Sequence, residues 1–112
     1  MLRRWNNRLS VSWLIAAGAC PALAQQGSAD LTRGQELAAN MCSFCHDVTR
    51  DQSGQTLDET PSFVKIASKP YQSPEAVAES IIFPHPDMPK VSFTATDLRD
   101  IIAYIMSLKT KD

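Results

Sequence analysis

The chain has 112 residues, which is enough for one domain at most. Eleven Lys and Arg stand against twelve Asp and Glu, but three arginines and no acid lie in residues 1–24. Residues 25–112 therefore hold eight basic and twelve acidic side chains, a net charge of −4 with neutral histidines. This acidic balance argues against nucleic acid or anionic lipid as a partner.

Residues 1–24 have the order of a secretory signal peptide. Three arginines precede a short apolar run, and small Ala22 and Ala24 follow at the positions that a signal peptidase reads. We expect cleavage after Ala24 and export to the periplasm. The alternative is a retained short anchor, although the apolar run falls short of the roughly 18–20 residues of a spanning helix. Lipidation at Cys20 is a weaker alternative, because Ala17 stands where a large aliphatic residue is normally required.

Cleavage would leave 88 of the 112 residues and two cysteines, Cys42 and Cys45. A chain of this size forms a small core. A disulfide between these cysteines would add little stability, because it closes a loop with only two intervening residues. We therefore expect another group to hold the fold together.

The first helix is predicted over residues 31–42, after a flexible N-terminus at 25–30. Asp30 suits its N-cap, and Gly34 inside it indicates the close approach of another element. A polar loop follows over residues 47–59, and no strand pattern appears in the chain.

Two short helices are predicted next. Thr60 and Pro61 suit the N-cap and first helical position of a helix that ends at Lys69, and Ser73 and Pro74 repeat this signal for a helix that ends at Phe83. The expected inner face of the second comprises Ala76, Val77, Ser80 and Ile81. The proline-rich segment after it can be neither helix nor central strand.

The last helix is the clearest. Thr94 and Asp97 have the spacing of a capping box. One apolar helical face follows, formed by Leu98, Ile101, Ile102, Ile105 and Leu108. The domain, 31–112, is thus predicted to be all-α, with short helices and long loops around a large apolar group.

The motif CSFCH, Cys42 to His46, admits three chemistries. A thioredoxin-like dithiol needs a βαβ setting, which the sequence does not indicate. A zinc site would need both cysteines, His46 and His85, and the adjacency of Cys45 and His46 makes tetrahedral geometry difficult. C-x-x-C-H is the signature of covalent haem attachment, in which two thiols add to the vinyl groups and the histidine reaches the iron. We favour one covalent haem c.

With this motif the chain resembles class I c-type cytochromes over residues 31–109. Gly34 and Tyr104 resemble the residues at which the family's N- and C-terminal helices cross. Pro61 resembles the proline whose carbonyl orients the axial histidine, and DMPK, around Met88, resembles the distal methionine loop. The resemblance implies the cytochrome c fold.

The resemblance also implies the iron ligands. His46 is the expected proximal ligand and Met88 the expected distal one, in a loop stiffened by flanking prolines. Met41 is expected in the core, and Met106 is expected at the surface or in edge packing. We interpret His85 as a loop residue near a haem edge or propionate. It is also the competing distal ligand, and a bis-histidine site would have a lower reduction potential.

Histidine and methionine together would leave no open iron position, which suits electron transfer rather than catalysis. We therefore expect a monomeric, non-enzymatic carrier that docks transiently with redox proteins and does not insert stably in a membrane. The alternatives are a sensor or small peroxidase with an open sixth position, and a subunit of a larger dehydrogenase or oxidase. The expected haem-lining residues are the final helix's face and Leu37, Phe44, Phe63, Ile66, Ile81, Phe83, Val91 and Phe93.

Overall fold

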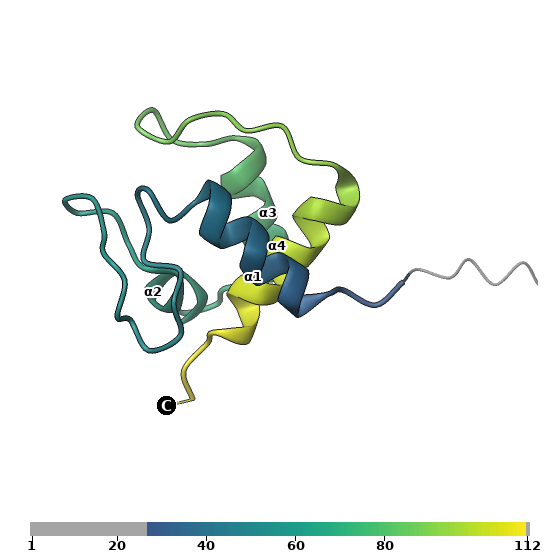
Figure 1. Ribbon diagram of the computed structural model, residues 1–112, viewed down its shortest axis with the longest axis horizontal. Coiled ribbons are helices and arrows are strands. Elements are labelled where there is room, and N and C mark those ends of the chain that lie inside the picture. Colours follow the sequence, from purple (N-terminus) through teal and green to yellow (C-terminus); the bar gives the residue numbers. More distant parts are fainter. Residues whose placement is uncertain (1–26, 112) are drawn as a thin grey trace, which may run out of the picture.

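The structure is a computed structural model that describes residues 27–111, and this part of the chain contains four helices and no strand (Figure 1). The helices are α1 (Leu31–Met41), α2 (Phe63–Ala67), α3 (Pro74–Ile82) and α4 (Ala95–Ser107). The all-α prediction is confirmed. The predicted signal peptide, 1–24, lies outside the described residues. Within 27–111, no helix has the length and apolar character needed to cross a membrane.

Local capping signals set the helix starts. The Asp30 carboxylate accepts a hydrogen bond from the backbone N–H of Arg33 at 3.0 Å, and Ser73 caps α3 with Pro74 as first helical residue. Thr94 and Asp97 form a reciprocal capping box at the start of α4. These contacts satisfy backbone N–H groups that have no partner inside the helix. The three predicted caps are confirmed.

The start of α2 differs from the prediction. The helix begins at Phe63 with Ser62 as N-cap, and Pro61 lies outside it. A first helical residue at 61 would offer its carbonyl to the N–H of Lys65, but that N–H is bound by the Ser62 hydroxyl at 3.2 Å. The Pro61 carbonyl instead faces His46. A tertiary contact therefore shortens the helix.

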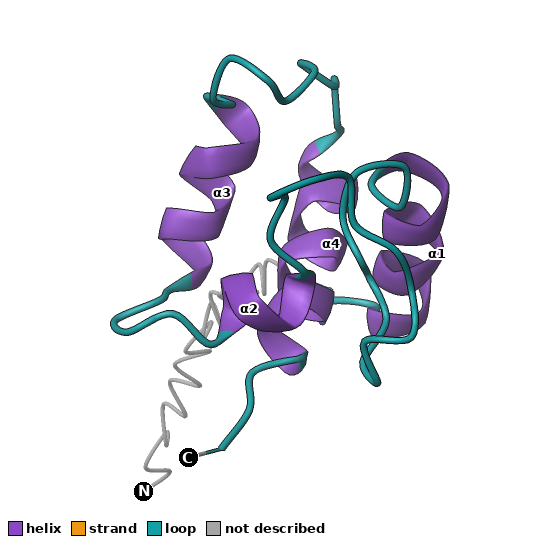
Figure 2. Cartoon of the chain, turned by 90° about the vertical axis from the view of Figure 1, so that its left-hand side faces the viewer, coloured by secondary structure: helices purple, strands orange, loops and turns teal. Residues whose placement is uncertain are grey.

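Helix α4 is the centre of the fold and packs against α1, α2 and α3. In Figure 2, α1 and α3 lie on opposite sides of α4, and the loop from α3 to α4 runs across the top, above α2. Of the predicted apolar face, Ile101, Ile105 and Leu108 are buried, while Leu98 and Ile102 are half-buried. Among residues 27–111, the buried apolar core comprises Ala38, Val48, Phe63, Val64, Ala67, Val77, Ile101, Tyr104, Ile105 and Leu108.

Gly34 permits the close contact of α1 with α4. A Cβ at this position would collide with the backbone carbonyl of Asp100 and lie 3.0 Å from the Cβ of Tyr104. The predicted role of this glycine at the helix crossing is confirmed. Glycine is needed here because it leaves room for the neighbouring backbone. It is not needed for an unusual backbone conformation, since no described glycine has a positive φ.

A charged cluster also joins α1 to α4. Asp100 is 1% exposed and accepts hydrogen bonds from the backbone N–H of Asp30 at 3.1 Å and from Arg33 at 2.8 Å. Arg33 also pairs with Asp97, and Arg99 pairs with Asp100. The N–H of Asp30, followed by Arg33, lowers the pKa of Asp100. Residue 30, expected at the end of a flexible segment, is thus anchored to α4.

Candidate functional site

The cysteine–histidine motif begins where α1 ends. Residues 42–46 form turns in which the Cys42 carbonyl accepts hydrogen bonds from the N–H groups of Cys45, at 3.2 Å, and His46, at 2.9 Å. Both thiols are free and half-buried. The motif therefore presents two unpaired sulfurs and one imidazole from a single compact turn.

The surroundings of the thiols do not suit dithiol exchange. Burial, followed by the neighbouring Cys45, raises the pKa of Cys42 to about 11, whereas redox-active thiols need a lowered pKa. The zinc alternative also lacks support, because within residues 27–111 no three His, Cys, Asp or Glu side chains gather where they could hold a metal ion. Both alternatives to haem attachment are disfavoured.

His46 is fixed by one hydrogen bond. Its side chain is 8% exposed, and Nδ1 lies 2.7 Å from the Pro61 carbonyl oxygen. A carbonyl can only accept, so Nδ1 carries the proton, and in the neutral ring Nε2 then has the free lone pair that metal coordination requires. The ring also packs against Phe63, with 5.5 Å between the ring centroids. The predicted pairing of His46 with Pro61 is confirmed.

The loop between the motif and α2 folds back on the motif. The N–H of Leu57 donates to the Cys45 carbonyl at 2.9 Å, and the N–H of Phe63 donates to the Asp47 carbonyl at 2.8 Å. From α4, the Tyr104 hydroxyl donates to the Val48 carbonyl at 2.6 Å. Asp47 is 4% exposed, although its place in a polar loop gave no sign of burial.

Several large apolar side chains near the motif and at the end of α3 are not fully covered by protein. Phe44 is 86% exposed and Phe83 76%, while Leu57 and Ile82 are about half exposed. Among the other expected haem-lining residues, Phe63 is buried, and Leu37, Ile66, Ile81, Val91 and Phe93 are half-buried. Free thiols, an available imidazole nitrogen and uncovered apolar side chains fit a large apolar group attached at the motif.

Met88 and His85 lie in the loop that joins α3 to α4. The N–H of Met88 donates to the His85 carbonyl at 3.0 Å, which closes a turn between them. The Met88 side chain is half-buried and the His85 side chain is exposed. Next to this loop lies an open groove of about 220 Å³. It is lined by Ile81, Ile82, Lys90, Val91, Ser92, Phe93 and Leu98.

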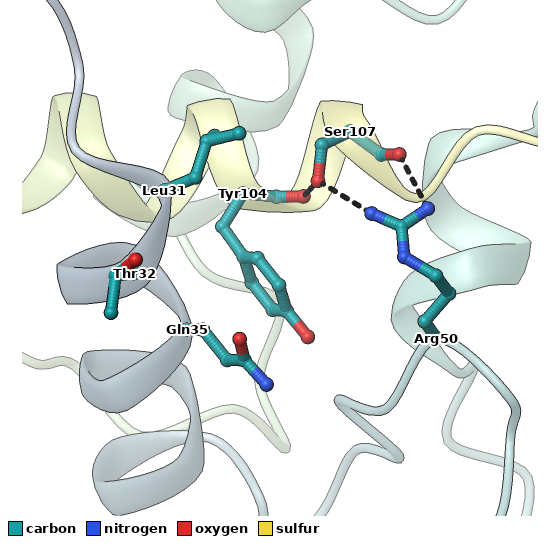
Figure 3. A pocket seen from close by; sticks show the side chains of 6 residues that line it. All are labelled: Leu31, Thr32, Gln35, Arg50, Tyr104 and Ser107. Atoms are coloured by element: carbon teal, nitrogen blue, oxygen red, sulfur yellow. Dashed lines mark hydrogen bonds between the residues drawn. The ribbon is translucent and has the colours of Figure 1, made fainter.

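A second hollow, of about 160 Å³, lies at the crossing of α1 and α4 (Figure 3). Arg50 closes one side by donating to the Ser107 carbonyl at 3.0 Å and to its hydroxyl at 3.3 Å. The remaining lining residues are Leu31, Thr32, Gln35 and Tyr104. Arg50 thus ties the loop after the motif to the end of α4.

Comparison with known proteins agrees with haem attachment at this motif. Residues 29–105 match the family model described as cytochrome c oxidase, cbb3-type, subunit III. The chain is 38% identical to cytochrome c-552 of Bradyrhizobium diazoefficiens over 95 residues, which cover 85% of this chain and 86% of the relative. No solved structure matches the chain significantly. The chain belongs to the c-type cytochromes, the electron-transfer proteins that carry haem c attached at a C-x-x-C-H motif.

Proposed function

We propose that this protein is an exported single-electron carrier whose haem is attached at Cys42 and Cys45 and ligated by His46 and Met88. The haem supplies one-electron chemistry when bound. The observation that carries the proposal is the hydrogen bond from His46 Nδ1 to the Pro61 carbonyl, which leaves Nε2 available beside two free thiols. Such a bond fixes the tautomer and orientation of a ligating histidine.

Met88 is the proposed distal ligand. Its thioether belongs to a half-buried side chain, whereas the His85 ring is exposed. Pro86 and Pro89 restrict the backbone around Met88, so that little conformational freedom would be lost on ligation. A methionine ligand raises the reduction potential relative to a second histidine.

Two permanent axial ligands suit transient exchange of single electrons with redox proteins. The charge of −4 over residues 25–112 favours partners with a basic docking face. We propose a monomer in the periplasm, released from the signal peptide at residue 24. A carrier of this kind could also serve as the electron-transfer subunit of a larger oxidoreductase. In that case the other subunits would co-purify with the native protein.

Visible spectra of the exported wild type, Met88→Ala and His85→Ala test the ligand pair. We expect a low-spin oxidised wild type with a weak long-wavelength sulfur-to-iron band, loss of this band in Met88→Ala and its retention in His85→Ala. A wild type that is high-spin and changes readily with carbon monoxide or cyanide would instead support an open sixth position. Loss of the band in neither variant would refute Met88 as ligand.

A further inference from the structure

The loop over residues 47–62 starts directly after His46 and ends by returning the Pro61 carbonyl to the same imidazole. Its first residue, Asp47, is a buried carboxylate with no role in the haem attachment proposed above. Leaving a carboxylate in a site that is 4% exposed is costly unless hydrogen bonds compensate. The contacts of Asp47 therefore indicate what this side chain does.

Thr49 holds the Asp47 carboxylate and the following turn together. Its backbone N–H and its hydroxyl both donate to Asp47 Oδ1, at 2.9 and 2.7 Å. The same hydroxyl oxygen accepts hydrogen bonds from the N–H groups of Ser53, at 3.0 Å, and Gly54, at 3.3 Å. One hydroxyl thus links the residue after the axial histidine to the far side of the turn.

Gly54 lies directly against this carboxylate. A Cβ at residue 54 would stand 2.5 Å from Asp47 Oδ1 and 2.9 Å from its Cγ, so a larger residue would displace either the carboxylate or the turn. We call Asp47, Thr49 and Gly54 the loop lock.

Local backbone preference does not explain the path of the loop. Gln52 and Asp58 adopt the left-handed region, with φ of 55° and 46°, which side chains other than glycine rarely occupy. Between these two residues, the chain returns to the motif, where the N–H of Leu57 donates a hydrogen bond to the Cys45 carbonyl. Contacts such as the loop lock must therefore maintain a course that the sequence alone disfavours.

We propose that Asp47 is a positioning residue for His46, acting through the loop lock to hold the Pro61 carbonyl against Nδ1. The inference rests on the proposed role of His46 as an iron ligand. A firm hydrogen bond to Nδ1 makes the imidazole a stronger electron donor and favours the oxidised iron. The loop lock would thereby influence the reduction potential. It would do so because the Asp47 carboxylate accepts hydrogen bonds from Thr49, and not because that carboxylate gains or loses a proton.

Thr49→Val and Thr49→Ser form the matched test in the haem-loaded protein. Valine keeps the shape of threonine but removes the hydroxyl, whereas serine keeps the hydroxyl. For Thr49→Val we expect about tenfold faster hydrogen exchange of the His46 Nδ1 proton, followed by NMR in the reduced protein, because local opening becomes easier. We also expect a more positive reduction potential. Thr49→Ser should resemble the wild type in both.

Asp47→Asn and Asp47→Ala provide a second pair if Thr49→Val does not fold. Asparagine retains an acceptor oxygen for Thr49, so Asp47→Asn should preserve the exchange rate and the potential, while Asp47→Ala should change both. A general loss of stability would lower the unfolding midpoint without shifting the potential of the folded protein.

Equal exchange rates and potentials in Thr49→Val and Thr49→Ser, with covalent haem and the sulfur band retained, would overturn the loop lock and leave the proposed function intact. Failure of the proposed function is visible separately, because a wild type without covalent pigment or sulfur band contradicts it before any variant is compared.

Discussion

The crossing of α1 and α4 buries its apolar residues against protein, whereas the two long loops beside it leave large aromatic side chains uncovered. At the crossing, Ala38, Ile101 and Ile105 are each no more than 3% exposed. In the haem-side loops, which we define as residues 42–62 and 83–93, Phe44 and Phe83 are more than three-quarters exposed. Both regions belong to the same small domain, so size alone does not explain the contrast.

The difference shows which part of the fold is packed by protein alone. Close packing at Gly34 and the ion pairs of Asp100 need only the two helices. The haem-side loops instead hold their own backbone by hydrogen bonds and leave apolar surface for another group. We infer that the crossing packs protein against protein and that haem completes the packing around the two loops.

Removing both thioether attachments should have the largest effect. In Cys42→Ala/Cys45→Ala, the haem-side loops lose their tethered apolar group, and we expect complete loss of covalent pigment and a largely unfolded chain. Absorbance after extraction with acidified organic solvent and the dispersion of the amide NMR spectrum measure these results. Cys42→Ala alone should keep its pigment through one attachment. A well-dispersed spectrum from the colourless double variant would contradict the need for haem.

Gly34→Ala should weaken the crossing next most strongly. Alanine favours a helix by about 1 kcal/mol over glycine, but a backbone carbonyl cannot rotate away from the added Cβ. We expect a net loss of about 2 kcal/mol in the free energy of unfolding, with an unchanged haem spectrum. Denaturant unfolding measures it. Gly27→Ala is the control, because its Cβ would have no neighbour nearer than Arg99 at 3.9 Å, and an equal loss there would refute the close-packing argument.

Phe83→Ala should have a smaller effect, confined to the haem-side loops. If haem covers this ring, its removal should lower the unfolding free energy of the loaded protein by about 1–2 kcal/mol. Tyr71→Ala offers a comparison, since Tyr71 is fully exposed in the turn between α2 and α3, and should change stability by less than about 0.5 kcal/mol. Similar results from the two variants would mean that Phe83 gains no cover from haem.

The sequence predicted three of the four helices well because their signals are local. Asp30, Ser73 and Thr94 each cap a helix through a residue three positions later, and the apolar face of α4 repeats within one helix. The C-x-x-C-H motif followed directly from the residues, whereas the pairing of His46 with Pro61 followed from family resemblance, and that pairing is confirmed. Met88 stays a prediction.

Long-range contacts account for what the sequence did not reveal. The start of α2 depends on where His46 lies, and the buried state of Asp100 depends on Arg33, 67 residues earlier. Asp47 and Asp100 are carboxylates in polar stretches, so hydropathy assigns both to the surface. Only the fold brings the N–H of Asp30 and the guanidinium of Arg33 to Asp100, whereas Asp47 takes its donors from Thr49, two residues later.

Acidification should have the smallest effect on stability near neutral pH. As the pH falls further, it should weaken the contact between α1 and α4. Asp100 has a lowered pKa in the folded protein, first because of the Asp30 N–H and then because of Arg33. Its contribution to stability is therefore complete above the unfolded pKa of about 3.9 and is lost as the pH falls through the folded value. Asp97, held mainly by Thr94 and then by Arg33, also has a lowered pKa and acts in the same direction.

We expect denaturant unfolding of the wild type to show lower stability at pH 3 than at pH 6, and Asp100→Asn to show a smaller difference between the two. Asp87→Asn removes one exposed carboxylate from the haem-side loops and is the matched control for charge. If Asp87→Asn reduced the acid sensitivity as much as Asp100→Asn, the sensitivity would reflect overall charge and not the crossing. A reduction specific to Asp100→Asn would show that the Asp100 carboxylate, buried between α1 and α4, stabilises the crossing.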